Sequence, residues 1–190
     1  MMKIICFCIS LFCIILFILN LVLGILRYIK VKKIHKALIA DQKYPSRINA
    51  ISHAVYRLSL LFILFSAVGS SMWFLFGELD TAFDFAIYIA LPVGVLFTCL
   101  SLFSLSKWDS FWVFDKTCFY KNSTKSKFEY SEILFAYVYC SSTGRGYIGW
   151  FANIKLANKK ISIGIYRNYV EKIKIRLSAY LSDDSIDTFN

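Results

Sequence analysis

The chain has 190 residues, of which 58% are hydrophobic and 18% aromatic, and its net charge is +10. A soluble globular chain is about 45–50% apolar, so this composition excludes a purely soluble domain, and the abundance of Phe, Ile and Leu excludes disorder. The basic residues gather beside apolar segments, which favours a role in membrane topology over direct nucleic-acid binding.

Residues 4–26 form the first apolar segment and contain no charged side chain. A hydrocarbon core about 30 Å thick needs about 20 helical residues, so this segment predicts a membrane-spanning helix. A cleaved signal peptide is the alternative, but its apolar region usually has about 7–15 residues and is followed by a small-residue cleavage site. We therefore interpret the segment as an uncleaved anchor.

A strongly basic connection follows at residues 27–57, with eight Lys and Arg residues against one acidic residue, Asp41. Basic residues beside membrane spans usually mark the cytoplasmic side. Four lysines of this connection are candidates for contact with anionic lipid, where each basic residue contributes about 1 kcal/mol. They are Lys30, Lys32, Lys33 and Lys36.

Within the basic connection, residues 31–43 predict a short helix. Val31, Ile34 and Leu38 share one face of it, and the Tyr-Pro pair that follows ends it, since the residue before a proline avoids helical geometry. One interpretation places this helix on the inner leaflet. The other treats the connection as a hydrophilic hairpin that only determines the topology.

Two further apolar segments, residues 58–76 and 85–105, are also long enough to span a bilayer. The second of these contains Pro92, which removes a helical hydrogen bond and predicts a kink. The loop between them, residues 77–84, carries three acidic residues and no basic one. The spans therefore predict an external N-terminus, a membrane domain over residues 1–106 and a cytoplasmic domain over residues 107–190.

Small residues recur at helical spacing in the second span and allow a close helix approach. They are Ser66, Ala67, Ser70 and Ser71. The same stripe serves either packing within one three-helix bundle or the formation of a homo-oligomer, and we favour the bundle.

Beyond residue 107 the pattern changes from continuous apolar runs to alternation. This alternation predicts a half-buried antiparallel sheet. In the last strands, Ile161, Ile163 and Ile165 alternate with Lys160 and Ser162. The six predicted strands are residues 111–115, 117–121, 127–130, 133–140, 147–156 and 160–166.

A helix is predicted to close the domain. Asn168 is its expected N-cap, and Glu171 stands three positions further on, as in a capping box. Apolar residues then recur at helical spacing as far as Leu181. Residues 182–190 predict a polar tail.

This order of elements resembles the pleckstrin-homology-like domains of small bacterial membrane proteins. The likeness covers residues 108–181, and the fold has seven strands where six are predicted, so the 133–156 region is expected to contain a bend or a further pairing. The segments that carry the likeness are Phe114-Asp115, residues 128–133, 154–156 and 158–161, and residues 168–181. The expected fold class is membrane α + β: three transmembrane helices followed by a pleckstrin-homology-like antiparallel β-sandwich or barrel with a C-terminal α-helix.

The resemblance implies a binding platform in a bacterial inner membrane, facing the cytoplasm. In many relatives a basic loop between the first two strands holds lipid phosphates, but the turn at residues 115–116 is too short for that. Two other loops supply the candidate partner or ligand residues, with a solvated turn as the alternative interpretation. These residues are Lys121, Lys125, Lys127 and Arg145.

Three classes of function are compatible with this organisation: an interaction protein, a transporter or channel subunit, and an enzyme. Intramembrane ionisable residues mark transport pathways, and the three spans contain none. No nucleophile–base pair, carboxylate pair or clustered metal ligands stand out, so we expect no catalytic residue, no metal and no cofactor. The favoured interpretation is a non-enzymatic membrane protein that docks a cytoplasmic protein partner or the inner leaflet.

The biological setting is read only from composition. The chain is rich in Phe, Ile, Tyr, Lys and Asn, whose codons are AT-rich, as in many laterally acquired genes. This favours a toxin-immunity or phage-defence membrane component over a housekeeping protein.

Overall fold

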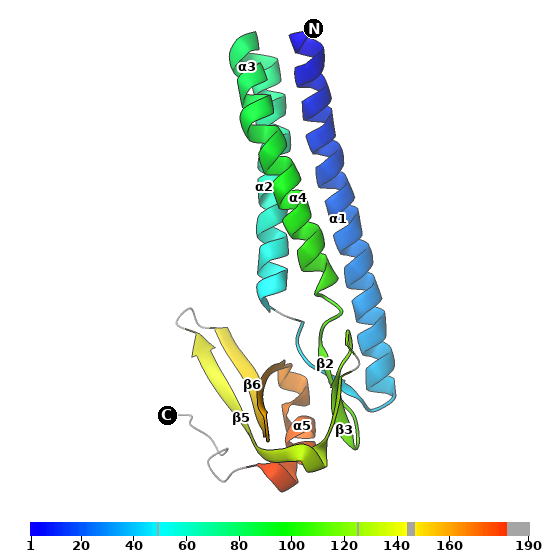
Figure 1. Ribbon diagram of the computed structural model, residues 1–190. Helices are drawn as coiled ribbons and strands as arrows, with labels where there is room; N and C mark the ends of the chain where they lie inside the picture. Colours follow the sequence, from blue (N-terminus) through cyan, green and yellow to red (C-terminus); the bar gives the residue numbers. More distant parts are fainter. Residues whose placement is uncertain (49, 125, 144–146, 182–190) are drawn as a thin grey trace. The chain divides into compact units, whose positions relative to one another are not determined.

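Long apolar helices and two antiparallel sheets make up the chain (Figure 1). The computed structural model describes residues 1–48, 50–124, 126–143 and 147–181. The chain divides into two units. The first comprises Met1–Lys30 and Ala50–Trp108, and the second comprises Val31–Asn49 and Asp109–Asn190.

The first unit is a bundle of three helical segments, each long and apolar enough to cross a membrane (Figure 1). α1 covers Met2–Ala40 and α2 covers Ala50–Phe76. The third segment consists of α3 (Leu79–Phe85), a π-helical turn η1 (Ala86–Ala90) and α4 (Leu91–Ser106). All three predicted spans are therefore helical, and α1 continues well beyond residue 26.

The π-helical turn lies directly before Pro92. The Leu91 N–H bonds to the Ala86 carbonyl, five residues back, which is the π-helical pattern. Pro92 has no N–H and its ring conflicts with the carbonyl four residues before it, so a widened turn accommodates it. The irregularity predicted from this proline thus takes the form of a local π-helical turn.

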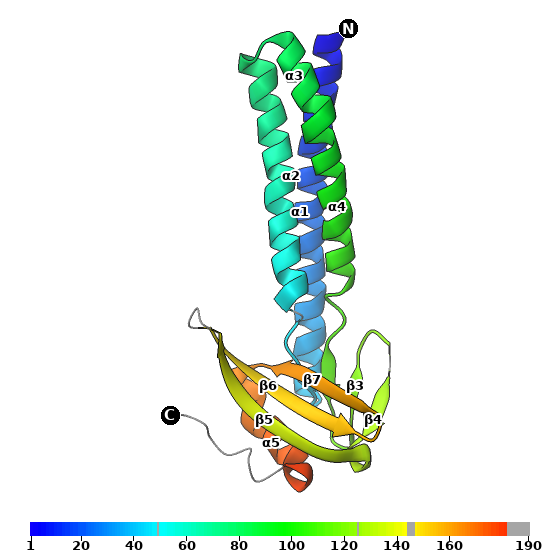
Figure 2. The same cartoon turned by 60° about the vertical axis from the view of Figure 1, so that its left-hand side comes forward.

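The second unit contains two antiparallel sheets. The first sheet has the order β1-β2-β3-β4. The second has the order β5-β6-β7 (Figure 2). The strands of the first sheet are β1 (Tyr44–Pro45), β2 (Trp112–Phe114), β3 (Cys118–Lys121) and β4 (Lys127–Glu129). Those of the second are β5 (Ile133–Thr143), β6 (Tyr147–Leu156) and β7 (Lys159–Ile165).

The seventh strand comes from the basic connection. Six strands, β2 to β7, lie in the region where six were predicted, and β1 adds to the free edge of β2 with Tyr44 opposite Phe114. Residues 31–49 therefore belong to the second unit, whereas the sequence analysis assigned them to the membrane domain. For residues 133–156 a bend or an extra pairing was expected: the extra pairing is found instead at β1, while the β5–β6 register is irregular between Ile133 and Phe135.

The residues after β1 connect the two sheets. The Ser46 N–H bonds to the Trp112 carbonyl at 2.7 Å, and the Ser46 hydroxyl oxygen accepts from the Trp112 N–H at 2.8 Å. The next N–H, that of Arg47, bonds to the Gly164 carbonyl on β7 at 2.8 Å. Residues 46 and 47 therefore form hydrogen bonds both to β2 of the first sheet and to β7 of the second.

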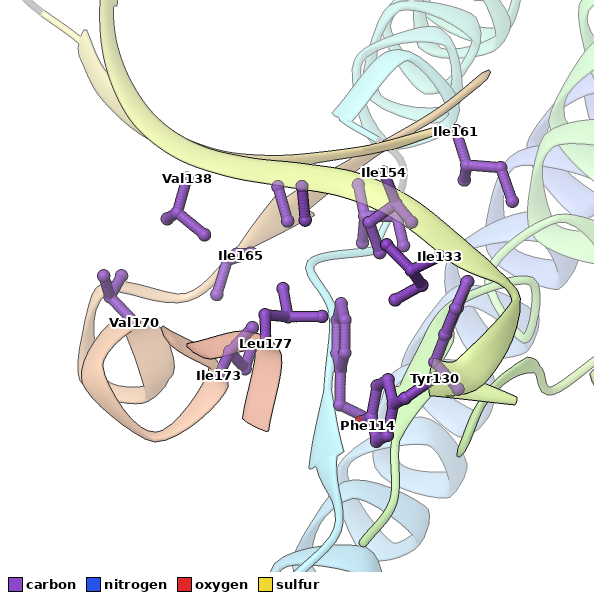
Figure 3. Packing of buried hydrophobic residues seen from close by; sticks show 14 of the residues in the cluster. Phe114, Tyr130, Ile133, Val138, Ile154, Ile161, Ile165, Val170, Ile173 and Leu177 are labelled. Carbon is purple, nitrogen blue, oxygen red and sulfur yellow. The ribbon is translucent and has the colours of Figure 1, made fainter. Parts of the chain in front are cut away.

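The core of the second unit lies between the two sheets and the terminal helix α5 (Val170–Leu177). Figure 3 shows side chains from these elements pointing toward one another. Ile161, Ile163 and Ile165 are buried as the alternation predicted, while Lys160 and Ser162 are exposed. From α5, Val170, Ile173 and Leu177 complete the core.

The predicted N-cap of the terminal helix is wrong. A 3-10 turn, η3 (Arg167–Tyr169), contains Asn168, and α5 begins after it with Tyr169 as an N-cap that makes no side-chain cap bond. The 3-10 turn ties the backbone locally, because the Tyr169 N–H bonds to the Tyr166 carbonyl at 2.9 Å. A capping box is found instead at Glu129 and Glu132, in the 3-10 turn η2 (Tyr130–Glu132) that follows β4.

Candidate functional site

The four candidate lipid-binding lysines lie on the part of α1 that belongs to the second unit or borders it. Lys30, Lys32, Lys33 and Lys36 are all exposed. The predicted short helix is the end of α1 rather than a separate element. Its apolar face packs against protein, since Val31 is 2% exposed and the His35 ring lies 4.5 Å from that of Phe111.

The end of α1 is fixed by polar contacts to the rest of the second unit. Gln42 adopts a positive φ of 59°, which reverses the chain direction, and its carbonyl accepts from Arg176 Nη2 at 2.6 Å. Lys43 Nζ lies 3.4 Å from Asp115 Oδ2, and this carboxylate raises the pKa of the Lys43 ammonium. These contacts stabilise the turn that connects α1 to β1.

Two of the candidate loop residues lie on one hairpin. Lys121 ends β3 and Lys127 begins β4, and Lys127 is exposed while Lys121 is half-buried. The hairpin is closed by the Lys121 N–H, which bonds to the Ser126 carbonyl at 3.0 Å. The other two candidates, Lys125 and Arg145, lie outside the described residues.

The small residues of the second span face the interior of the bundle. Ser66, Ala67 and Ser70 are each less than 5% exposed. The Ser71 and Ser10 hydroxyls are hydrogen-bonded to each other at 2.7 Å, which links α2 to α1. This stripe is therefore occupied by contacts within one copy of the chain.

A polar cluster inside the bundle draws on all three helical segments. Asn20 is fully buried, and its Nδ2 donates to Thr98 Oγ1 on α4 at 3.4 Å and to the Leu16 carbonyl at 2.8 Å. From α2, the Tyr56 hydroxyl donates to the Asn20 carbonyl at 3.0 Å. Gly24 makes room for this contact, because a Cβ there would collide with that hydroxyl.

Sequence reasoning missed a cavity in the second unit. It has a volume of about 80 Å³ and is lined by Arg47, Trp150, Ile165 and Arg167. Arg47 follows β1, whereas Arg167 follows β7. The two arginines are far apart in sequence, and the partner strand that brings them together was not predicted, so no local pattern could have found this site.

Comparisons with family models, with curated proteins and with solved structures give no match for this chain. Within the described ranges, no group of three or more His, Cys, Asp and Glu side chains is placed to hold a metal ion.

Proposed function

We propose that this chain is a non-enzymatic integral membrane protein whose second unit docks a cytoplasmic protein partner or the inner leaflet. The observation that carries the proposal is the chain path: α1 leads into β1, β1 leads into α2, and α4 leads into β2. The β unit is thus joined to apolar helices at three points of the chain. Such a unit is held at the membrane surface without needing a separate anchor.

The strand arrangement supports a pleckstrin-homology-like fold for the second unit. A four-stranded antiparallel sheet, a three-stranded antiparallel sheet and a helix after the last strand follow one another in the order of that fold. In this proposal the α2–α4 hairpin is an insertion between the first two strands. Fold does not determine function, so the docking role is tested separately below.

The proposed orientation places the N-terminus outside a bacterial inner membrane and the second unit in the cytoplasm. The charge asymmetry supports it: the exposed lysines lie at the C-terminal end of α1, while the exposed acidic residues Glu78, Asp80 and Asp84 lie in the α2–α3 turn and in α3. A reporter that works only in the cytoplasm should be active when it is fused after Asn190. Activity of a reporter that works only in the periplasm, fused at the same position, would overturn this orientation.

The docking role is tested with the full chain in native-lipid particles. We expect a soluble partner to co-purify in fixed ratio with the wild type and to be lost from a chain ending at residue 106.

The leaflet alternative is tested by energy transfer between a dye and labelled lipid. The dye is attached to a cysteine that replaces the exposed Ser162, and the transfer should increase with the content of anionic lipid. Glutamine at the four α1 lysines should remove that increase, and glutamine at Lys160 and Lys172 serves as a charge control. Absence of both signals would refute docking.

The proposed biological setting is a toxin-immunity or phage-defence component, and only the residue composition supports it. Deleting the gene in its native host should then change toxin survival or phage plaque counts without affecting growth. A growth defect with unchanged plaque counts and toxin survival would argue for a housekeeping role.

A channel or transporter subunit is the second candidate, and the polar cluster in the bundle is the observation that favours it. Among the described residues, Asn20 Oδ1 and Ser101 Oγ are buried without a hydrogen-bond partner. Polar groups inside membrane spans are costly to bury, and those retained there often serve a function. Ion flux into liposomes that carry the pure protein, abolished by Asn20→Leu, would support this candidate over the docking role.

A further inference from the structure

Two arginines from distant parts of the chain line one cavity of the second unit. Arg47 and Arg167 contribute the polar part of its wall, and Trp150 and Ile165 contribute the apolar part. Ile165 is fully buried in the core, and Trp150 packs against that core. The apolar side of the cavity is therefore rigid, whereas both arginines are exposed side chains.

The Arg47 side chain passes close to two glycines. A Cβ on Gly164 would lie 3.7 Å from Arg47 Cβ and 3.8 Å from its Cδ. A Cβ on Gly149 would lie 3.6 Å from Arg47 Nη1. The aliphatic stem thus runs along β7 and the guanidinium reaches β6, while the backbone bond from the Arg47 N–H to the Gly164 carbonyl fixes its origin.

Neither guanidinium is neutralised by a residue within the described ranges. Among the residues that the structure describes, Arg47 and Arg167 have no ion-pair or hydrogen-bond partner for their side chains. A third cation, Lys174 Nζ, lies 5.7 Å from the Trp150 ring centre, although it also pairs with Glu171 at 3.4 Å. Like charges around one cavity repel each other, and an anion bound between them would offset that repulsion.

We propose that the Arg47–Arg167 cavity binds a phosphate monoester group. Each guanidinium presents a planar fork of N–H donors that matches phosphate oxygens in bidentate fashion. A phosphate monoester carries a charge of about −1.5 to −2 at pH 7 and three acceptor oxygens, so one group can satisfy both forks and balance both charges. A carboxylate has one charge and two oxygens and would leave one arginine unmatched. Trp150 and Ile165 bound the same cavity and offer an apolar surface to the body that carries the phosphate.

This site does not depend on the docking role proposed above. Its ligand has two chemical sources, a soluble phosphate monoester or the monoester headgroup of phosphatidic acid. The two sources share the recognised group, and the experiment below separates them.

The test uses the full chain in phosphatidylcholine nanodiscs, titrated calorimetrically with inorganic phosphate at low salt. We expect saturable binding to one site, with the dissociation constant raised at least about tenfold by Arg47→Gln or Arg167→Gln. Lys160→Gln removes one charge from the neighbouring strand and should leave the constant unchanged. Arg47→Lys and Arg167→Lys keep the charge and the stem but not the fork, so they should weaken binding as well.

Adding phosphatidic acid to the nanodiscs distinguishes the sources. If the lipid headgroup reaches the cavity, it competes and raises the apparent dissociation constant for inorganic phosphate; if it does not, the constant stays the same and the ligand is soluble. The proposal is overturned if phosphate shows no saturable binding in phosphatidylcholine nanodiscs. It is also overturned if glutamine and lysine variants that unfold at the wild-type temperature bind as the wild type does.

Discussion

Tyr44 is the cross-strand partner of Phe114, although α2 and α4 both lie between the two residues in the sequence. The pairing makes the second unit discontinuous, because its first strand precedes the hairpin and its other six strands follow it. It also requires both ends of the α2–α4 hairpin to return to the same β unit.

A fragment of residues 107–190 should fold poorly on its own. It lacks β1 and the hydrogen bonds of Ser46 and Arg47, each of which contributes about 0.5–1.5 kcal/mol, and it exposes the edge of β2. Joining residues 41–48 to residue 109 through a flexible linker should restore a monomer with a cooperative thermal transition. Circular dichroism and size-exclusion chromatography report both properties, and equal stability of the two fragments would show that β1 is dispensable.

Ser46→Ala should destabilise the second unit in the linked fragment by about 1–3 kcal/mol, because the Trp112 N–H loses its buried acceptor. Urea unfolding of that fragment measures the difference. Ser162 is exposed on β7, so Ser162→Ala provides the control and should change the free energy of unfolding by less than about 0.5 kcal/mol. A comparable loss in the two variants would contradict the role assigned to Ser46.

Gly24→Ala should destabilise the bundle by about 1–3 kcal/mol, the usual range for overpacking. The added methyl group collides with the Tyr56 hydroxyl and lies 2.5 Å from the Tyr56 Cζ. Gly94→Ala is the matched control, since its nearest neighbour, Cys13 Sγ, lies at 3.5 Å. The thermal midpoint in detergent measures both variants. If Gly24→Ala costs as much in a Tyr56→Ala background as in the wild type, the collision is not the cause.

Ala67→Leu and Ser70→Leu should each lower the thermal stability of the detergent-solubilised chain, because both positions are buried between helices and have no room for a larger side chain. Val68 and Met72 are exposed neighbours on α2, so Val68→Leu and Met72→Leu should have little effect. Unchanged midpoints for the two buried substitutions would argue against the packing seen in the bundle. A changed oligomer size at unchanged midpoint would place this stripe between copies of the chain.

The second unit should lose stability at high pH through Tyr130. Burial raises the pKa of the Tyr130 phenol, and the Arg176 charge lowers it by a smaller amount. In the folded state the phenol donates to the Asp115 carbonyl at 2.8 Å. In the unfolded chain the Tyr130 phenol ionises near pH 10, whereas in the folded chain its raised pKa keeps it neutral at that pH. The contribution of the neutral phenol to stability is therefore complete below pH 10 and is lost as the pH rises above it. The free energy of unfolding should therefore fall less steeply above pH 10 in Tyr130→Phe than in the wild type; parallel curves would exclude this explanation.

Periodicity was sufficient to predict most of the architecture. The three apolar segments and the alternation of Ile161, Ile163 and Ile165 are long repeating signals that depend only on neighbours in the sequence. β1 has no such signal, since Tyr44–Pro45 is only two residues long and exists because β2 offers it an edge. A proline is compatible with an edge strand because its missing N–H is not needed there.

The candidate sites were harder to predict because they too depend on residues that are distant in the sequence. Arg47 and Arg167 line one cavity only because β1 and β7 are brought together by the bond from the Arg47 N–H to the Gly164 carbonyl. At the terminal helix, the pattern from Asn168 to Glu171 matched a capping box. The 3-10 turn before α5 instead forms a backbone hydrogen bond from the Tyr169 N–H to the Tyr166 carbonyl. Local motifs thus failed wherever a competing local turn or a distant strand decided the geometry.

The pairing of Tyr44 with Phe114 also imposes an order on biosynthesis. Tyr44 leaves the ribosome long before Phe114, and until then it has no strand to join. The four-stranded sheet can therefore be completed only after the whole α2–α4 hairpin has been synthesised.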